Sequence, residues 1–223
     1  MSRSVNAADL SRTFTREFEV DGDKCLVIHQ SEIGDVGCVV WDAAIVLSSY
    51  MRTNDFILHD RRNVLEGKRV IELGAGTGVV GIHAAALGAV VVITDLEDFV
   101  PLMQKNINCN RAAFSHEITA RPLKWGENQQ EFLPPPDYLM LADCIYYEES
   151  LDPLVLTIKD LCGPKTIVFC CYEERLTDAK IALEMKFHKL IDKYFHVEKI
   201  PLERQDVHFR SEDIHILKMR LKK

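Results

Sequence analysis

The stretch Val70-Ile-Glu-Leu-Gly-Ala-Gly-Thr-Gly78 decides the fold of this chain. It begins as an apolar strand and runs into a glycine turn, and the apolar segment Val79–Leu87 that follows is typical of a helix ended by Gly88. Val91-Val-Ile-Thr-Asp95 then predicts a second strand, which ends in an acid. Together these segments predict a βαβ unit with a nucleotide-type binding site at the glycine turn.

Glycines and one carboxylate of this unit are candidate ligand contacts. Gly74, Gly76 and Gly78 allow the backbone to turn sharply and to approach a ligand, which any side chain would obstruct. Asp95 lies at the predicted carboxyl end of the second strand, where a carboxylate can accept hydrogen bonds from the two ribose hydroxyls of an adenosine group. We therefore expect an adenosine-containing ligand here.

The glycine spacing fits more than one adenosine ligand. Read from Gly76, the run Gly76-x-Gly78-x-x-Gly81 also fits the dinucleotide pattern. Glu72 favours S-adenosylmethionine, because an unpaired carboxylate in a buried strand is costly and needs a cationic or hydrogen-bonding partner. The cationic amino-acid end of this methyl donor supplies one, whereas a pyrophosphate would be repelled. We rank the methyl donor first, a dinucleotide second and a purely structural turn third.

Length and composition limit the class of protein. The 223 residues, 47% of them hydrophobic, predict one core and leave little room for the separate substrate domain of hydride-transfer enzymes. The formal net charge is −7 and no cluster of lysine and arginine alternates with aromatic residues, so the footprint of a nucleic-acid binder is missing. The seven cysteines form no CxxC pair and the histidines lack metal-ligand spacing, which favours reduced thiols and no metal centre.

No targeting or membrane segment is expected. Residues 1–10 are polar, and the longest apolar tract, Val79–Ile93, is shorter than the roughly 20 residues that a membrane span needs. We therefore expect a cytoplasmic monomer without nucleic-acid or membrane partners. An acidic face would favour a basic partner, such as a lysine-bearing segment of a protein.

The segments around the βαβ unit predict a larger α/β fold. Phe14–Val20 and Cys25–Gln30 flank the turn Asp21-Gly22-Asp23 and predict a β-hairpin, Ser31–Gly37 a flexible connection, and Val39–Met51 a helix containing Trp41. Further helices are predicted over Glu97–Asn110, Glu148–Cys162 and Asp178–Lys193, and further strands over Glu117–Lys124, Tyr138–Ala142, Thr166–Tyr172, Phe195–Ile200 and Asp213–Leu221.

The order of these elements predicts the fold class. Strands that alternate with helices form a parallel sheet, and two final strands without a helix between them imply an antiparallel end. We expect a Rossmann-like α/β fold, with a mostly parallel seven-stranded sheet and an antiparallel C-terminal strand, preceded by the hairpin and a helix. The expected division is an N-terminal hairpin extension, 1–36, and a main domain, 37–223.

Residues that follow the parallel strands should meet at one edge of the sheet. Beside the glycine turn these are Asp95, Trp125 and Asp143-Cys-Ile-Tyr146. Asp143 can orient an amine nucleophile, and Tyr146 can hydrogen-bond the amine or line its channel. Each has another interpretation, since Asp143 can cap the following helix and Tyr146, Tyr147 and Trp125 can be packing aromatics. Because these residues directly follow predicted strands, we favour a role in the binding site over these alternatives.

At these residues the chain resembles a known family. Glu72-Leu-Gly-Ala-Gly-Thr-Gly78 with Asp95, Trp125 and Asp143-Cys-Ile-Tyr146 looks like the seven-β-strand protein methyltransferases that carry an Asp/Glu-x-x-Tyr motif after strand four. More narrowly, three segments resemble the lysine methyltransferases that modify the valosin-containing AAA ATPase: Gly37-Cys-Val-Val-Trp-Asp-Ala-Ala-Ile-Val-Leu47, Ala142-Asp-Cys-Ile-Tyr-Tyr-Glu-Glu-Ser150 and Arg210-Ser-Glu-Asp-Ile-His-Ile216. The match fades in Met1–Asp35 and Thr53–Asn63.

The resemblance implies methylation of a protein lysine by S-adenosylmethionine, up to trimethyl-lysine, with S-adenosylhomocysteine as product and the valosin-containing AAA ATPase as substrate. It makes Asp143 and Tyr146 the motif at the lysine channel. With Glu72 included, the expected cofactor contacts are Trp41, Glu72, Gly74, Ala75, Gly76, Asp95, Trp125 and Ala142. A methyltransferase of another protein or a small molecule and a non-catalytic cofactor-binding adaptor stay open, although the polar mouth at Asp143 and Tyr146 favours an enzyme.

Overall fold

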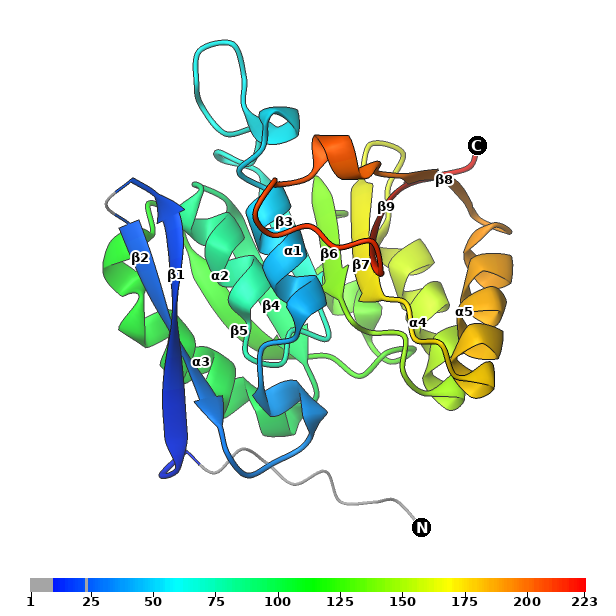
Figure 1. The fold of residues 1–223 in the computed structure, drawn as a ribbon, viewed down its shortest axis with the longest axis horizontal. Coiled ribbons are helices and arrows are strands. Elements are labelled where there is room, and N and C mark those ends of the chain that lie inside the picture. The colour runs from blue at the N-terminus through cyan, green and yellow to red at the C-terminus, as the bar shows by residue number, and fades with distance from the viewer. Residues whose placement is uncertain (1–9, 23) are drawn as a thin grey trace.

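The computed structural model describes residues 10–22 and 24–223 and contains two sheets (Figure 1). The small sheet pairs β1 (Thr13–Asp21) with β2 (Lys24–Ser31). The large sheet has the order β5-β4-β3-β6-β7-β9-β8. Its strands are β3 (Arg69–Leu73), β4 (Val90–Asp95), β5 (Ile118–Pro122), β6 (Tyr138–Ala142), β7 (Ile167–Glu173), β8 (Phe195–Lys199) and β9 (Ile214–Leu221).

The directions of the strands confirm the predicted fold class. β5, β4, β3, β6 and β7 pair in parallel, whereas β9 pairs antiparallel with both β7 and β8. β9 does not extend the sheet outward, because it inserts between β7 and β8 and leaves β8 at the edge. The result is the Rossmann-like arrangement with an antiparallel C-terminal strand, preceded by the hairpin.

Helices cover both faces of the large sheet (Figure 1). α1 (Asp42–Tyr50), α2 (Val79–Ala86) and α3 (Val100–Cys109) pack on one face, and α4 (Glu148–Leu161) and α5 (Asp178–Ile191) pack on the other. Successive strand residues belong to opposite faces, as strand geometry requires: Met140 packs toward α1 and α2, whereas Leu139 and Leu141 pack toward α4 and α5. By the same alternation Glu72 lies on the α2 side.

Two helices begin later than predicted, and each has a local cause. α1 begins at Asp42 instead of Val39, because Val40 N donates to Gln30 Oε1 (2.8 Å) and the Trp41 indole donates to Val36 O (2.8 Å), which hold this segment extended. The predicted helix 97–110 divides into a short 3₁₀ turn, η3 (Glu97–Phe99), and α3, since Pro101 in the first turn of α3 lacks the amide that would continue the earlier turn.

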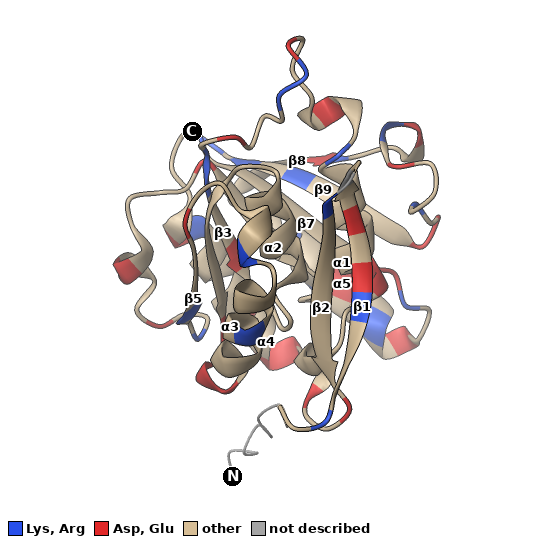
Figure 2. Ribbon diagram, turned by 90° about the vertical axis from the view of Figure 1, so that its left-hand side faces the viewer, with Lys and Arg blue, Asp and Glu red and all other residues tan. Residues whose placement is uncertain are grey.

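The β1–β2 hairpin, which the structure confirms, is attached to α3 through two asparagine side chains. Asn106 accepts from His29 N (2.7 Å) and donates to His29 O (2.9 Å), and Asn110 makes the same pair of bonds to Val27 at 2.8 Å each. β2 is therefore hydrogen-bonded on both edges. Figure 2 shows charged residues of both signs along β1 and none gathered into a basic stripe over the hairpin and α3. Across the described ranges, no helix is both long and apolar enough to cross a membrane.

Candidate functional site

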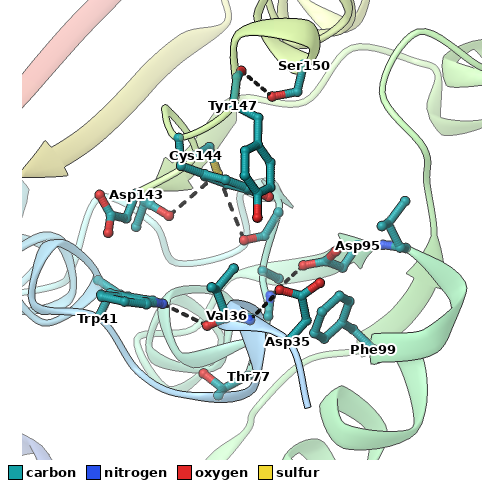
Figure 3. A pocket seen from close by; sticks show the side chains of 18 of the residues that line it. Asp35, Val36, Trp41, Thr77, Asp95, Phe99, Asp143, Cys144, Tyr147 and Ser150 are labelled. Carbon is teal, nitrogen blue, oxygen red and sulfur yellow. Dashed lines mark hydrogen bonds between the residues drawn. The ribbon is translucent and has the colours of Figure 1, made fainter. Parts of the chain in front are cut away.

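A cavity of about 480 Å³ opens beyond the carboxyl ends of the parallel strands (Figure 3). Its lining comes from the segments that follow β3, β4, β5, β6 and β7 and from the chain that leads into α1. All the residues predicted as site residues line it: Trp41, Glu72, Gly74, Ala75, Gly76, Asp95, Trp125, Ala142, Asp143 and Tyr146. The structure thus brings the predicted set together, and their individual roles stay predictions.

The glycine turn is shaped by its protein neighbours. Gly74 and Gly76 have positive φ angles of 60° and 53°. A Cβ atom at Gly74 would lie 2.7 Å from Cys144 Sγ and 2.9 Å from the Trp125 ring, and one at Gly76 would lie 2.5 Å from Gly37 O. The sequence pattern predicts that these glycines allow close approach of a ligand, and the structure shows that they also make room for protein atoms.

Asp95 is fixed against this turn. Its Oδ2 accepts from Gly76 N and its Oδ1 from Leu96 N, both at 2.7 Å. Burial raises the pKa of Asp95 to about 6, and the negative charge of Asp35 adds to this shift, while the two amide bonds oppose it. The carboxylate is therefore held in one orientation at the edge where a ribose is expected.

Glu72 finds the partner that the sequence analysis required inside the protein itself. The buried side chain accepts from Gly81 N in α2 at 2.7 Å. Burial and the nearby charge of Asp95 raise the pKa of Glu72 to about 8 in spite of this bond. At neutral pH the carboxyl group is thus mostly protonated, and a cation brought into the cavity would favour its ionised form.

Asp143 occupies a strained position at the mouth of the cavity. Its φ angle of 54° lies in the left-handed region, a conformation that costs free energy in a non-glycine residue and is over-represented at functional sites. Its Oδ2 accepts from Arg175 Nη2 at 2.9 Å. Burial raises the pKa of Asp143, and the Arg175 charge opposes this. Asp143 does not cap α4, since Tyr147 occupies the cap position of that helix.

Two tyrosines follow Asp143 and pack edge to face. The rings of Tyr146 and Tyr147 lie 4.7 Å apart, and in Figure 3 the Tyr147 ring reaches into the cavity. Burial raises the pKa of Tyr146 well above its usual value, so its hydroxyl stays protonated. The Tyr146 carbonyl accepts from Lys180 Nζ at 2.7 Å. Tyr146 can therefore orient a nucleophile through its hydroxyl, and it is unsuited to act as a base.

Several lining residues were not predicted from sequence. Asp35 and Val36 come from the segment interpreted as a flexible connection, which forms a 3₁₀ turn, η1 (Val36–Cys38), capped by the Asp35 side chain. Phe99 closes the same side of the cavity. Arg175 enters from the loop after β7. Of these segments, only η1 had a signal in the sequence, because the resemblance to the lysine methyltransferases begins at Gly37.

The lining fits the expected methyl donor. Glu72 and Asp95 are held by backbone amides and retain acceptor capacity toward a cationic or hydroxyl-bearing ligand. Trp125 and Phe99 supply apolar surface for a nucleoside base. Among the residues that the structure describes, no group of three or more His, Cys, Asp or Glu side chains is placed to hold a metal ion.

Comparisons with known proteins identify the family of the chain. Residues 21–194 match the profile of the family described as "Lysine methyltransferase". The chain is 32% identical over 184 residues to EEF1A lysine methyltransferase 3 of Xenopus tropicalis (82% of this chain, 75% of the relative) and 36% identical over 186 residues to protein N-lysine methyltransferase METTL21A of Danio rerio (81% and 76%).

Solved structures agree in fold. The mitomycin 7-O-methyltransferase MmcR superposes with a TM-score of 0.58 at 12% identity, covering 81% of this chain and 54% of that one. Human N-acetylserotonin methyltransferase, solved in complex with SAM, superposes with a TM-score of 0.52 at 14% identity, covering 70% of this chain and 48% of that one. At this identity the likeness concerns the fold alone.

Proposed function

The chain belongs to the lysine methyltransferase family, and from this premise we propose that it uses S-adenosylmethionine to methylate a lysine of the valosin-containing AAA ATPase, up to the trimethyl state. The observation that carries the proposal is the pairing of Asp143, a mostly buried carboxylate in the lining of the cavity, with the cationic side chain of Arg175. The segments 37–47, 142–150 and 210–216, which resemble methyltransferases of that ATPase, support this substrate.

The proposed reaction needs no covalent intermediate with the protein. When bound, S-adenosylmethionine supplies the methyl group from its sulfonium. A lysine amine must release its proton to solvent before it can attack, and its ordinary pKa near 10.4 leaves only a small neutral fraction at pH 7. Burial lowers that pKa, whereas the Asp143 carboxylate raises it, so Asp143 orients the amine and does not act as a strong base. Tyr146 can accept a hydrogen bond from the amine, and alignment with exclusion of water supplies most of the rate.

Cofactor roles follow from the placement of the lining residues. We propose that Asp95 accepts from the ribose hydroxyls, that Glu72 faces the cationic amino-acid end, and that Gly74–Gly76 form the floor. Trp41, Trp125 and Ala142 complete the contacts. Methyl transfer leaves S-adenosylhomocysteine in the cavity.

The rim of the cavity favours a basic protein segment. Asp35 and Glu149 line it, and Glu173 lies beside it through its contact with Arg175. Two lysines also line the cavity, but Lys124 is paired with Glu127 and Lys180 donates to the Tyr146 carbonyl. A lysine flanked by further basic residues complements these acids.

We also propose that the enzyme acts as a monomer and that it works in the cytoplasm. Its seven free cysteines favour this reducing compartment. The hairpin within 1–36 is proposed as an extension of the methyltransferase domain, 37–223.

A second candidate substrate is the elongation factor EEF1A, for which one of the relatives is named. That relative and METTL21A have comparable identity to this chain, so identity alone does not choose among substrates.

Mass spectrometry tests the proposal. We expect purified enzyme and S-adenosylmethionine to add methyl groups, up to three, to one lysine of the valosin-containing AAA ATPase. Asp143→Ala should abolish transfer while calorimetry still detects S-adenosylmethionine binding. Asp160→Ala is the matched control, since Asp160 is an exposed α4 carboxylate that contacts Lys159 and Gln129 outside the cavity. An unmodified ATPase beside a methylated EEF1A would replace the substrate, and full activity of Asp143→Ala would remove the assigned role.

A further inference from the structure

Arg175 places a cation at the acid assigned to the substrate lysine. Its Nη2 lies 2.9 Å from Asp143 Oδ2 and 3.5 Å from Glu173 Oε2, and its guanidinium carbon lies 5.3 Å from the centre of the Trp41 ring. Arg175 also lines the cavity, with a third of its side chain exposed, whereas Asp143 is 10% exposed. The guanidinium therefore lies against Asp143 within the lining of the cavity.

We propose that Arg175 occupies the position of the substrate ammonium while no substrate is bound, and that the incoming lysine displaces it toward Glu173. This inference rests on the proposed lysine methylation. Arg175 is a specificity-determining residue in this view: only a substrate whose other contacts contribute enough binding free energy replaces the resident cation.

Displacement follows from charge. Arg175 pairs with Asp143, and the charge of Lys180, which donates to the Tyr146 carbonyl, also lowers the pKa of Asp143. An ammonium added beside this one mostly buried carboxylate would be repelled by both cations. Glu173, which is 36% exposed and already near the guanidinium, offers Arg175 a second acidic partner outside the cavity. The side chain can therefore leave Asp143 and keep an opposite charge beside it.

Arginine is suited to this position by its chemistry. A guanidinium balances the Asp143 charge without presenting the free amine lone pair that a methyl acceptor needs. The planar group also lies over the Trp41 ring, which favours cations on its face. The site is thus ordered before the substrate arrives, and it is protected from small amines that cannot outcompete the arginine.

The experiment compares Arg175→Gln with Arg204→Gln. Arg204 is an equally ion-paired arginine, held by Asp55 and Glu198 outside the cavity lining, and serves as the matched control. The dissociation constant of the valosin-containing AAA ATPase is measured on enzyme saturated with S-adenosylhomocysteine. A competing internal cation reduces apparent affinity by the fraction of competent molecules, so Arg175→Gln should bind about three- to tenfold more tightly and Arg204→Gln like wild type.

A second measurement does not depend on the protein substrate. Butylammonium is titrated against the carboxyl carbon resonance of Asp143, and its half-saturation should fall about three- to tenfold in Arg175→Gln. Unchanged or weaker binding of both probes would overturn the inference and make Arg175 a structural brace or a direct substrate contact. Wild-type enzyme that methylates no lysine would instead refute the proposed function.

Discussion

Glu72 links the cofactor site to pH. With a pKa of about 8 in the folded protein against an ordinary 4.5, Glu72 keeps its proton where the unfolded chain has lost it. The folded state then binds more protons, so the free energy of unfolding falls as the pH rises between these values, by up to about 1.4 kcal/mol per pH unit. The pKa of Asp95 is raised only to about 6, so above that pH the decline belongs to Glu72.

Glu72→Gln should remove this decline. The amide cannot ionise and keeps an oxygen for the Gly81 amide, so we expect urea unfolding of the variant to show a flat free energy between about pH 6.5 and 8, where wild type loses about 2 kcal/mol. Calorimetry should also show about tenfold weaker S-adenosylmethionine binding, since a charged contact is lost. Equal slopes in both proteins would mean that Glu72 is already ionised.

At the scale of residues, sequence predicted the contents of the site better than its internal bonds. Glu72 required a partner on general grounds, but its bond to Gly81 depends on how α2 lies over β3, which no local pattern encodes. Arg175 and Asp35 come from loops, where no hydrophobic period exists to locate them. They reach the cavity because segments far apart in the sequence come together there, which only the folded structure shows.

Among the helices, α3 connects the hairpin to the glycine turn through one residue. The buried amide of Asn106 bonds both backbone groups of His29 and also donates to Thr77 O at 2.9 Å. Thr77 lies within the glycine turn, so this side chain links the hairpin directly to the turn that lines the cavity.

Asn106→Ala should destabilise the protein by about 2–3 kcal/mol in urea unfolding, because it leaves the part-buried backbone groups of His29 and the buried Thr77 carbonyl without their Asn106 partner. Affinity for S-adenosylmethionine should fall as well. Asn108→Ala on the exposed side of α3 is the control and should cost less than about 0.5 kcal/mol. Equal losses in both variants would show that α3 tolerates no substitution and that the Asn106 bonds are not the cause.

Element boundaries show where sequence patterns succeed. β6, α4 and α5 start at their predicted residues, because apolar periodicity changes there and α5 has Thr177 and Asp178 at its start. α1 starts later than predicted because Gln30 and Val36 hold Val40 and Trp41 extended through tertiary hydrogen bonds. The pattern of residues 39–51 contains no sign of those distant acceptors.

Over the whole molecule, the net charge of −7 and the acidic rim predict a salt-dependent encounter with substrate. Salt screens exposed charges, so raising sodium chloride from about 0.05 to 0.3 M should raise the KM for the protein substrate about threefold or more, with kcat little changed. Steady-state kinetics of Glu149→Gln should show a weaker salt dependence. Glu66 pairs with Arg62 outside the cavity lining, so Glu66→Gln should behave like wild type. If KM depends on salt equally in wild type and both variants, the acidic rim is not the cause of the salt dependence.

The insertion of β9 between β7 and β8 has a consequence for biosynthesis. A ribosome delivers β7 and β8 before β9, and until β9 arrives each of them presents an open backbone edge that can pair with a foreign strand. Burial on both faces of β9 means that its entry also completes the hydrophobic core. A nascent chain that stops short of Ile214 therefore lacks β9, leaves both of these edges open and is prone to aggregation.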